Sequence, residues 1–230
     1  MRIVVAGAHG QVARHLTRLL AVRGDSVTGI VRNPAHVADL TADGAQPAVL
    51  DLESASVEDV SAVVSGADAV VFAAGAGPGS GAARKDTVDR AAAVLLADAA
   101  QAAGVGRYLL VSSMGVDPVA GGRRPEGLDD VFVAYLEAKL AAEQDLLARR
   151  SLRTTVLRPG GLTDDPGTGR VALAPSVERG AVPREDVAAV LVALLDAGTD
   201  GVVLELVGGP TPIADAVAAL PSPFSPGGPG

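Results

Sequence analysis

Tyr135 and Lys139 are the residues of this sequence whose types and spacing best suit proton transfer. They lie four positions apart in Tyr135-Leu136-Glu137-Ala138-Lys139, within a segment of helical periodicity, so they share one helix face one turn apart. A tyrosine hydroxyl has a pKa of about 10, and acid or base catalysis near neutral pH needs a cation that favours the phenolate. Lys139 can supply that charge. Because the pair could also arise by chance on a helix, the interpretation depends on the surrounding motifs.

Two hydroxyl groups precede this helix. Ser112 and Ser113 follow the apolar run Leu109-Leu110-Val111, which predicts a strand that ends at these serines. A hydroxyl at the carboxyl end of a parallel strand can hydrogen-bond a substrate oxygen whose charge changes during the reaction. We expect Ser113 to be the active hydroxyl, and Ser112 is the alternative.

A glycine-rich segment near the start of the chain predicts an anion-binding turn. Gly7-Ala8-His9-Gly10-Gln11-Val12-Ala13 follows the apolar run Ile3-Val4-Val5-Ala6 and opens a helical pattern. Glycines let the backbone approach a pyrophosphate closely, and the following helix presents free N–H groups to it. The segment therefore predicts a dinucleotide site that includes Gly7, His9, Gly10, Gln11 and Val12. A tight strand-to-helix turn without a ligand is the alternative.

The end of the second predicted strand bears on the choice between NAD and NADP. A carboxylate there would accept a hydrogen bond from the adenosine ribose, whereas an arginine would pair with a 2′-phosphate. This sequence has Arg32 and Asn33 at that point, and the segment between Val27 and His36 contains no Asp or Glu. The pattern favours NADP over NAD. An ordinary surface arginine is the alternative.

Composition restricts the class of protein and its partners. Of the 230 residues 48% are hydrophobic but only 2% are aromatic, so Ala, Val and Leu must build the core, as suits helices packed closely on a parallel sheet. The net charge of −8 argues against nucleic acid and anionic membranes as partners. The partner we expect is a small-molecule substrate, with the chain as a monomer or homodimer.

The sequence also lacks features that metal sites, disulfides and membrane segments require. The sequence lacks cysteine, which excludes disulfides and thiolate metal sites, and its three histidines lack the spacing of metal ligands, so we expect no metal. Apolar runs are too short for a signal peptide or a membrane span. These features predict a cytoplasmic protein.

Strand-like and helical patterns alternate along most of the chain. The predicted strands are 2–6, 26–31, 47–50, 68–74, 107–112, 153–157 and 201–207. The predicted helices are 11–22, 56–64, 86–103, 131–149, 183–196 and 212–220. This alternation predicts an α/β fold, a Rossmann-type doubly wound parallel sheet with helices on both faces and a small C-terminal appendage. Residues 1–220 should form one domain, with a small substrate-side portion in 158–220. The Pro- and Gly-rich tail 221–230 is predicted to be disordered.

Several motifs in order make the sequence similar to a known family. They are AGAHGQVA, VRNP, VLDLE, DAVVFAAGAG, GVGRYLLVSSMGVD, YLEAK, LRPGGLTDDPGTG and VPREDVAAVL. Over roughly residues 1–220 the chain resembles short-chain dehydrogenases/reductases. Within them it is similar to the atypical branch of NAD(P)H-binding, NmrA-like and NAD(P)-dependent epimerase-like proteins.

The resemblance implies roles for individual residues. It implies that Asp51 and Leu52 flank the adenine, that Ala73, Ala74 and Gly75 lie along the cofactor, and that Pro159 and Gly160 approach the nicotinamide. Its catalytic set would be Ser113, Tyr135 and Lys139, with Lys139 also reaching the nicotinamide ribose. Asp89 stands where the family usually has an asparagine, which puts the usual proton relay in doubt.

These observations predict an NADP-dependent oxidoreductase that reduces a small carbonyl, quinone or flavin-like substrate. Tyr135 would donate the proton, Ser113 would orient the oxygen, and Lys139 would bias the tyrosine. Two alternatives stay open: a non-catalytic NADP-binding sensor, against which the Tyr-x-x-x-Lys pair argues, and an epimerase or isomerase that recycles its cofactor. The short portion that follows residue 157 argues against a nucleotide-sugar epimerase.

Overall fold

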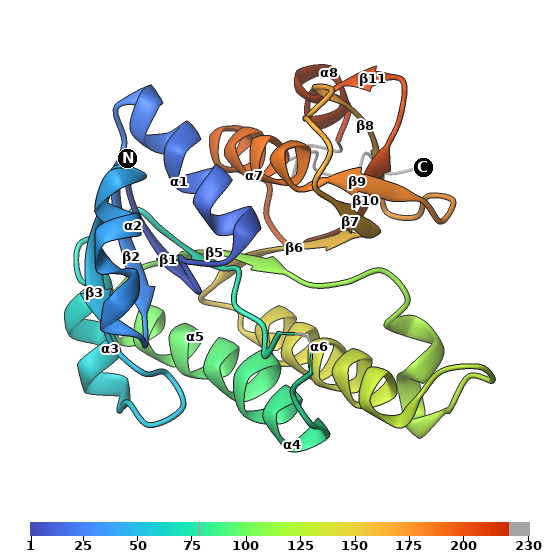
Figure 1. The fold of residues 1–230 in the computed structure, drawn as a ribbon, viewed down its shortest axis with the longest axis horizontal. Helices are drawn as coiled ribbons and strands as arrows, with labels where there is room; N and C mark the ends of the chain where they lie inside the picture. The colour runs from blue at the N-terminus through green and yellow to red at the C-terminus, as the bar shows by residue number, and fades with distance from the viewer. Residues whose placement is uncertain (78, 221–230) are drawn as a thin grey trace, which may run out of the picture.

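The centre of the molecule is a nine-stranded sheet in the order β11-β8-β10-β6-β5-β4-β1-β2-β3 (Figure 1). A computed structural model describes residues 1–77 and 79–220 of the chain. The strands are β1 (Arg2–Ala6), β2 (Ser26–Val31), β3 (Ala45–Val49), β4 (Ala69–Phe72), β5 (Arg107–Val111), β6 (Arg153–Pro159), β7 (Gly161–Thr163), β8 (Arg170–Ala174), β9 (Ala181–Pro183), β10 (Val202–Gly208) and β11 (Thr211–Pro212). All pairs from β3 across to β10 are parallel, which confirms the predicted α/β fold.

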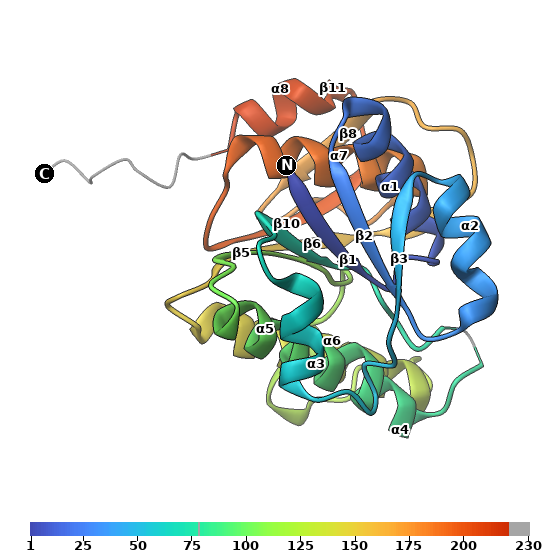
Figure 2. The ribbon, with the colours of Figure 1, turned by 90° about the vertical axis from the view of Figure 1, so that its left-hand side faces the viewer.

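Helices cover both faces of the sheet. They are α1 (Gln11–Arg23), α2 (Val37–Ala42), α3 (Val57–Val64), α4 (Ala82–Arg84), α5 (Ala92–Ala102), α6 (Asp130–Ala148), α7 (Arg184–Ala197) and α8 (Ile213–Ala218). Three further helical segments are η1 (Pro34–His36), the π-helical η2 (Lys85–Ala91) and η3 (Asp117–Gly122). Figure 2 shows α1, α7 and α8 on one side of the sheet and α3, α5 and α6 on the other. In the described ranges, no helix has both the length and the apolar character needed to cross a membrane.

The alternation of side chains along β1 creates the two cores. Ile3 and Val5 point to the layer that contains α1 and α7, whereas Val4 and Ala6 point to the layer that contains α3 and α5. All four side chains are buried. A run of apolar residues buried on both faces is typical of a central strand in a parallel sheet.

The structure adds elements that the sequence patterns did not predict. Strand β8 pairs antiparallel with β10, so the far edge of the sheet departs from the predicted all-parallel arrangement. Helix α2 and the small parallel pair of β7 and β9 were also missed. These segments are only three to six residues long, too short to show a hydrophobic period. The predicted disordered tail, 221–230, lies outside the described residues.

The sheet order changes direction between β1 and β4. From β1 the chain proceeds outward through β2 to β3, and after β4 it proceeds in the opposite sense through β5 to β6. In open α/β sheets, ligands bind beside the carboxyl ends of the strands at this point. The ends of β1 and β4, at Ala6 and Phe72, therefore mark the expected binding region.

Candidate functional site

The turn after β1 depends on two glycines. Gly7 has a φ of +75°, and a Cβ there would lie 2.5 Å from Ala74 Cα, so only glycine fits beside the end of β4. Gly10 has an ordinary φ of −64° and begins α1. Its N–H donates to the Gly7 carbonyl at 2.8 Å, which closes the turn.

The first turn of α1 has free backbone N–H groups and no acidic side chain, as an anion-binding helix start requires. Gly10 provides no side-chain cap, and the first turn contains no acidic residue. The opening N–H groups of a helix carry partial positive charge and need an acceptor. Gly10 and Gln11 both line a cavity at this point. The predicted turn residues thus present backbone donors to an opening where a pyrophosphate can bind.

One cavity, of about 270 Å³, extends from this turn toward β2 and β3. Its walls come from the ends of β1, β2 and β4 and from the segments that follow β3 and β4. The lining includes the predicted Gly7, His9, Gly10, Arg32, Asp51, Leu52, Ala73, Ala74 and Gly75, together with Ile30, Val31, His36, Leu50, Glu53, Arg84, Val88 and Ala92. Apolar walls beside charged groups suit a flat base attached to a charged sugar phosphate.

Two arginines converge on one carboxylate at the edge of this cavity. Glu53 Oε2 accepts hydrogen bonds from Arg32 Nη1 at 3.1 Å and from Arg84 Nη2 at 2.7 Å. Glu53 Oε1 accepts from Thr87 Oγ1 at 2.7 Å. Glu53 lies outside the segment between Val27 and His36 where an acid was sought, and it reaches Arg32 from the segment after β3. Arg32 thus has both a second arginine and an acid beside it.

His9 and His36 lie at the same cavity as a stacked pair, with ring centroids 3.6 Å apart. His9 Nε2 is 2.8 Å from Asp39 Oδ2, and this hydrogen bond lowers the pKa of the Asp39 carboxyl. The contacts with Asp39 and His36 hold the His9 ring at this cavity. Within the ranges that the structure describes, acidic and histidine side chains form no group of three that could hold a metal ion.

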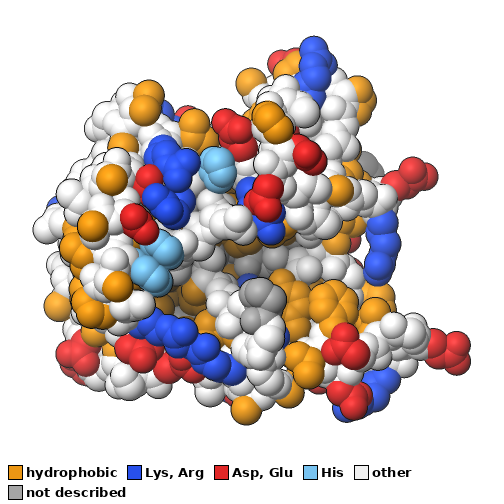
Figure 3. Space-filling view, viewed as in Figure 1, with side chains coloured by type: hydrophobic (Ala, Val, Ile, Leu, Met, Phe, Trp, Pro, Cys, Tyr) orange, Lys and Arg blue, Asp and Glu red, His pale blue; other side chains and the backbone are white. Residues whose placement is uncertain are grey.

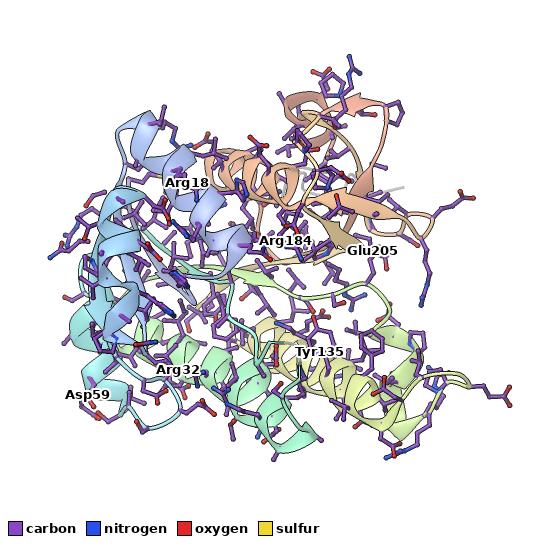
Figure 4. The ribbon with its side chains drawn as sticks, in the orientation of Figure 1. Arg18, Arg32, Asp59, Tyr135, Arg184 and Glu205 are labelled. Atoms are coloured by element: carbon purple, nitrogen blue, oxygen red, sulfur yellow. The ribbon has the colours of Figure 1, made fainter. Side chains whose placement is uncertain are left out.

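A second cavity, of about 620 Å³, continues from the glycine turn toward α6. The space-filling view shows a hollow at the centre of this face (Figure 3). The labelled side chains show Tyr135, from α6, on one side of the opening and Arg184, from α7, on the other (Figure 4). The lining includes the predicted Gln11, Val12, Tyr135, Lys139 and Pro159, and also Lys85, Asp89, Ser112, Phe132, Leu162 and Arg184.

Tyr135 has an aromatic neighbour and two cationic ones. Its ring stacks on Phe132 with centroids 5.7 Å apart. The Lys85 ammonium lies 5.4 Å from the centroid of the Tyr135 ring, and the Lys139 ammonium lies 5.8 Å from it. The predicted pair of Tyr135 and Lys139 is therefore adjacent in space, as its spacing on α6 requires.

Lys139 is almost wholly buried, and its charge is balanced inside the protein. Its Nζ lies 3.2 Å from Asp89 Oδ1, with 4% of the lysine side chain and 0% of the aspartate side chain exposed. The same Nζ donates to the carbonyls of Val111 at 3.1 Å and Ala74 at 3.4 Å. Asp89 Oδ1 lacks a well-directed hydrogen bond, so its attraction to Lys139 is mainly Coulombic. The second oxygen of Asp89 accepts from the N–H of Ala76 at 3.2 Å.

The two serines after β5 lie in different environments. Ser112 lines the second cavity, and its hydroxyl donates to Glu143 Oε1. The buried Glu143 also accepts from Arg158 Nε at 3.0 Å. Burial alone would lower the pKa of the Arg158 guanidinium, but the hydrogen bonds from Arg158 to Glu143 raise it overall. Ser113 Oγ donates to the adjacent Met114 carbonyl at 3.2 Å.

Three predicted residues lie outside the lining of both cavities: Ser113, Asn33 and Gly160. The Asn33 side chain accepts from the Ala35 N–H at 3.0 Å and caps η1. The Gly160 N–H donates to the Leu206 carbonyl at 2.8 Å. In this structure, Asn33 and Gly160 therefore shape the backbone beside the cavities.

Several charged residues at or beside the two cavities were not predicted as site residues: Glu53, Arg84, Lys85, Asp129, Glu143 and Arg184. Lys85 lies one residue before the predicted helix 86–103, four positions from Asp89, so no predicted element linked it to the catalytic set. Glu53 lies two residues after Asp51, on a segment already assigned to the adenine side. The pairing of Glu143 with Arg158 depends on the contact between α6 and β6, which the sequence motifs do not show.

Comparisons with known proteins agree with this geometry. A family model described as NAD(P)H-binding matches residues 7–198. An uncharacterized sugar epimerase of Bacillus subtilis (strain 168), YhfK, is 35% identical over 222 residues, covering 96% of this chain and 100% of that protein. A solved structure named "Putative NAD-dependent epimerase/dehydratase from Bacillus halodurans" is 36% identical with a TM-score of 0.85, covering 96% of this chain and 100% of that one. The structure of ChuY, an anaerobilin reductase from Escherichia coli O157:H7, is 25% identical with a TM-score of 0.76, covering 90% of this chain and 97% of that one.

Proposed function

This chain belongs to the NAD(P)H-binding family, and from that premise we propose that it is an NADP-dependent oxidoreductase that reduces a small carbonyl, quinone or flavin-like acceptor. The observation that carries the proposal is the position of Tyr135. Its side chain lines the second cavity, with Lys85 and Lys139 beside the ring. A tyrosine beside ammonium groups is suited to transfer a proton at the same opening where a dinucleotide would end.

The residues at both cavities fit the cofactor. Gly7, Gly10 and the uncapped start of α1 suit the pyrophosphate, because a side chain at either glycine would crowd the turn. The apolar walls of the first cavity, including Leu52 and Val88, suit the adenine. The second cavity, which shares Gly10 and residues 73–75 with the first, is then left for the nicotinamide and the acceptor.

The preference for NADP over NAD rests on Arg32 and Arg84. Two guanidinium groups that already meet at one carboxylate can bind a phosphate dianion with several charge-assisted hydrogen bonds. Glu53 opposes this preference, because it would repel the phosphate and could accept from a ribose hydroxyl. We propose that the two arginines outweigh Glu53, which then keeps only its hydrogen bond from Thr87.

The chain's own residues supply the proton chemistry. When bound, the reduced cofactor supplies a hydride to the acceptor. Tyr135 gives its hydroxyl proton to the acceptor oxygen, and Lys139 stabilises the phenolate that remains until water returns the proton. For Ser113 to orient the oxygen as the sequence predicts, its hydroxyl must turn into the second cavity, whose lining it lies outside, and exchange its hydrogen bond to Met114 for one to the acceptor. Ser112 already donates its hydrogen bond to Glu143 and is the less suitable donor to the acceptor.

The names of two relatives favour a second candidate function. The proteins from Bacillus subtilis and Bacillus halodurans are described as epimerases, and an epimerase would oxidise and re-reduce one substrate on a cofactor that stays bound. A sensor would bind the cofactor without turnover.

A screen of NADPH oxidation against carbonyl, quinone and flavin acceptors separates these functions. A reductase consumes NADPH in proportion to the acceptor. An epimerase converts substrate with no net change in nicotinamide absorbance. A sensor converts no substrate and leaves the nicotinamide absorbance unchanged. A panel without any NADPH consumption, although NADPH binds, would count against the reductase proposal.

A further inference from the structure

The sequence contains only two lysines, Lys85 and Lys139, against many arginines, and both lysines lie at the ring of Tyr135. They come from different elements, η2 and α6, which are far apart in the sequence. A chain that otherwise uses arginine for its cations thus has a small ammonium group at two positions of one cavity. The positive charges of the two ammonium groups, however, are compensated to different degrees.

Lys139 has the counter-ion Asp89, whereas the Lys85 ammonium has one hydrogen-bond acceptor and no counter-ion among the described residues. Lys85 is 9% exposed and lines the second cavity. Its Nζ donates to the Gly77 carbonyl at 2.9 Å. Over the part of the chain that the structure describes, no carboxylate lies within the 4.0 Å ion-pair distance of this Nζ. The remaining residues, 78 and 221–230, contain no Asp or Glu side chain.

The two aspartates that line the second cavity interact with other groups. Asp89 lies against Lys139, and Asp129 accepts from the Phe132 N–H at 2.9 Å as the cap of α6. A buried ammonium without a counter-ion is costly, because burial removes its water without supplying an opposite charge. One carbonyl and the face of a tyrosine ring compensate for only part of that loss. The cavity therefore offers an uncompensated positive charge to whatever enters it.

The same cavity has a flat apolar wall. Phe132 and Tyr135 stack at an interplanar angle of 27°, and Val131 and Leu162 also line the cavity. Phe132 and Leu162 are 41% and 40% exposed, although large apolar side chains are usually buried. An exposed aromatic and aliphatic surface inside a cleft is typical of a ligand site.

We propose that Lys85 is the counter-ion for an acidic group on the substrate, and that the substrate is a planar conjugated carbonyl compound with a carboxylate or similar anion. This inference rests on the proposed reductase function and names the substrate class of that site. The conjugated part lies on Phe132 and Tyr135, and the anion pairs with Lys85. The acceptor oxygen then lies within reach of the Tyr135 hydroxyl.

The local backbone supports a functional role for this lysine. Residues 85–91 form a π-helix, and such wide turns are frequent at functional sites. This turn carries both Lys85 and Asp89 to the cavity while Arg90 stays on the outside, paired with Asp86 at 2.5 Å. Lysine suits the position because a compact ammonium can swing from Gly77 to a ligand.

A binding experiment tests the proposal with two matched probes, a fluorenone carboxylate and the corresponding neutral carboxamide. Dissociation constants for both are measured by calorimetry with the NADP⁺-saturated protein, so the result does not depend on turnover. We expect the carboxylate to bind about tenfold more tightly or better, as one charge-assisted hydrogen bond to a buried cation provides. The net charge of −8 works against a non-specific preference for anions.

Variants at position 85 assign the preference to the lysine. Lys85→Met should bind the two probes equally, and Lys85→Arg should keep part of the preference. Arg90→Met removes a cation from the outer side of the same π-helix and should leave the preference unchanged. Equal binding of the probes by the unmutated protein, or an unchanged preference in Lys85→Met, would overturn the proposal. A preference that depends on Lys85 without any NADPH oxidation would support the anion site and contradict the reductase function instead.

Discussion

Lys139 Nζ and Asp89 Oδ1 form a buried ion pair, 3.2 Å apart, between α6 and the π-helix η2. The pair joins the lysine of the predicted catalytic set to the residue that departs from the family's usual asparagine. Both residues line the second cavity, and the second carboxylate oxygen of Asp89 accepts a hydrogen bond from the N–H of Ala76 in the cavity wall.

Asp89→Asn should destabilise the fold strongly. The substitution leaves the Lys139 charge buried without a partner, and breaking a buried pair in this way typically costs about 3–5 kcal/mol. Urea unfolding of the two proteins measures the difference. Lys139→Met together with Asp89→Asn should recover part of the loss, because the double variant has no unpaired charge. A double variant as unstable as the sum of the single ones would show that the two groups do not interact.

Tyr135→Phe should lower turnover about 10²–10⁴-fold while cofactor affinity persists, because the ring and its packing remain and only the transferable proton is removed. The chain offers a matched control in Tyr108, its other tyrosine. Tyr108 is fully buried and donates to the Ala93 carbonyl at 2.9 Å, and burial raises the pKa of its phenol. Tyr108→Phe should reduce stability and leave kcat unchanged. Full activity in Tyr135→Phe would remove this residue from the mechanism.

The choice of cofactor can be tested at three residues. Arg32→Ala and Arg84→Ala should each lower NADPH affinity by about 1–3 kcal/mol, with little effect on NADH. Glu53→Gln should have the opposite effect on NADPH, because it removes the carboxylate that competes for both arginines. Fluorescence titration with each cofactor gives the affinities. Arg150→Ala, at an exposed position, controls for the change in net charge. Equal affinities of the unmutated protein for NADPH and NADH would contradict the assignment.

Asp43 links stability to pH. Burial by itself would raise the pKa of this carboxyl, but hydrogen bonds from Arg14 and Arg18 lower it overall. A carboxyl whose pKa is lower in the folded state stabilises the protein above its unfolded pKa of about 3.9, and this contribution is lost as the pH falls through the folded value. Asp43→Asn should therefore lower Tm at neutral pH, and the difference from the unmutated protein should shrink below about pH 4.

Thermal unfolding followed by circular dichroism between neutral pH and about pH 3 checks this expectation. Asp165→Asn, at an exposed position, is the control and should change Tm little at any pH. A difference for Asp43→Asn that stays constant across the pH range would show that the carboxylate charge is not the cause.

Local patterns predicted the parts of the site that a few consecutive residues determine. The turn from Gly7 to Gly10 follows from glycine conformation, and the adjacency of Tyr135 and Lys139 follows from helix geometry. Central strands such as β1 were predictable because burial on both faces leaves an unbroken apolar run.

The missed residues depend on contacts that no local pattern encodes. Glu53 reaches Arg32 only because β2 and β3 lie side by side, and Lys85 reaches Tyr135 only because a π-helix rotates it toward α6. Glu143 was read as part of a helix, but it binds Arg158 across the contact between α6 and β6. Such residues become visible when the topology brings distant segments together.

The most direct test of the proposed reductase function follows the hydride from NADPH to the acceptor. NADPH that carries deuterium at the transferable position of the nicotinamide is incubated with the protein and a carbonyl acceptor from the screen, whose carbon keeps the transferred deuterium in a non-exchangeable C–D bond. The product is examined by mass spectrometry. The account predicts one deuterium in the reduced acceptor for each NADPH consumed, with a rate that falls in Tyr135→Phe. Product without deuterium, or NADPH that keeps its label while substrate is converted, would contradict it.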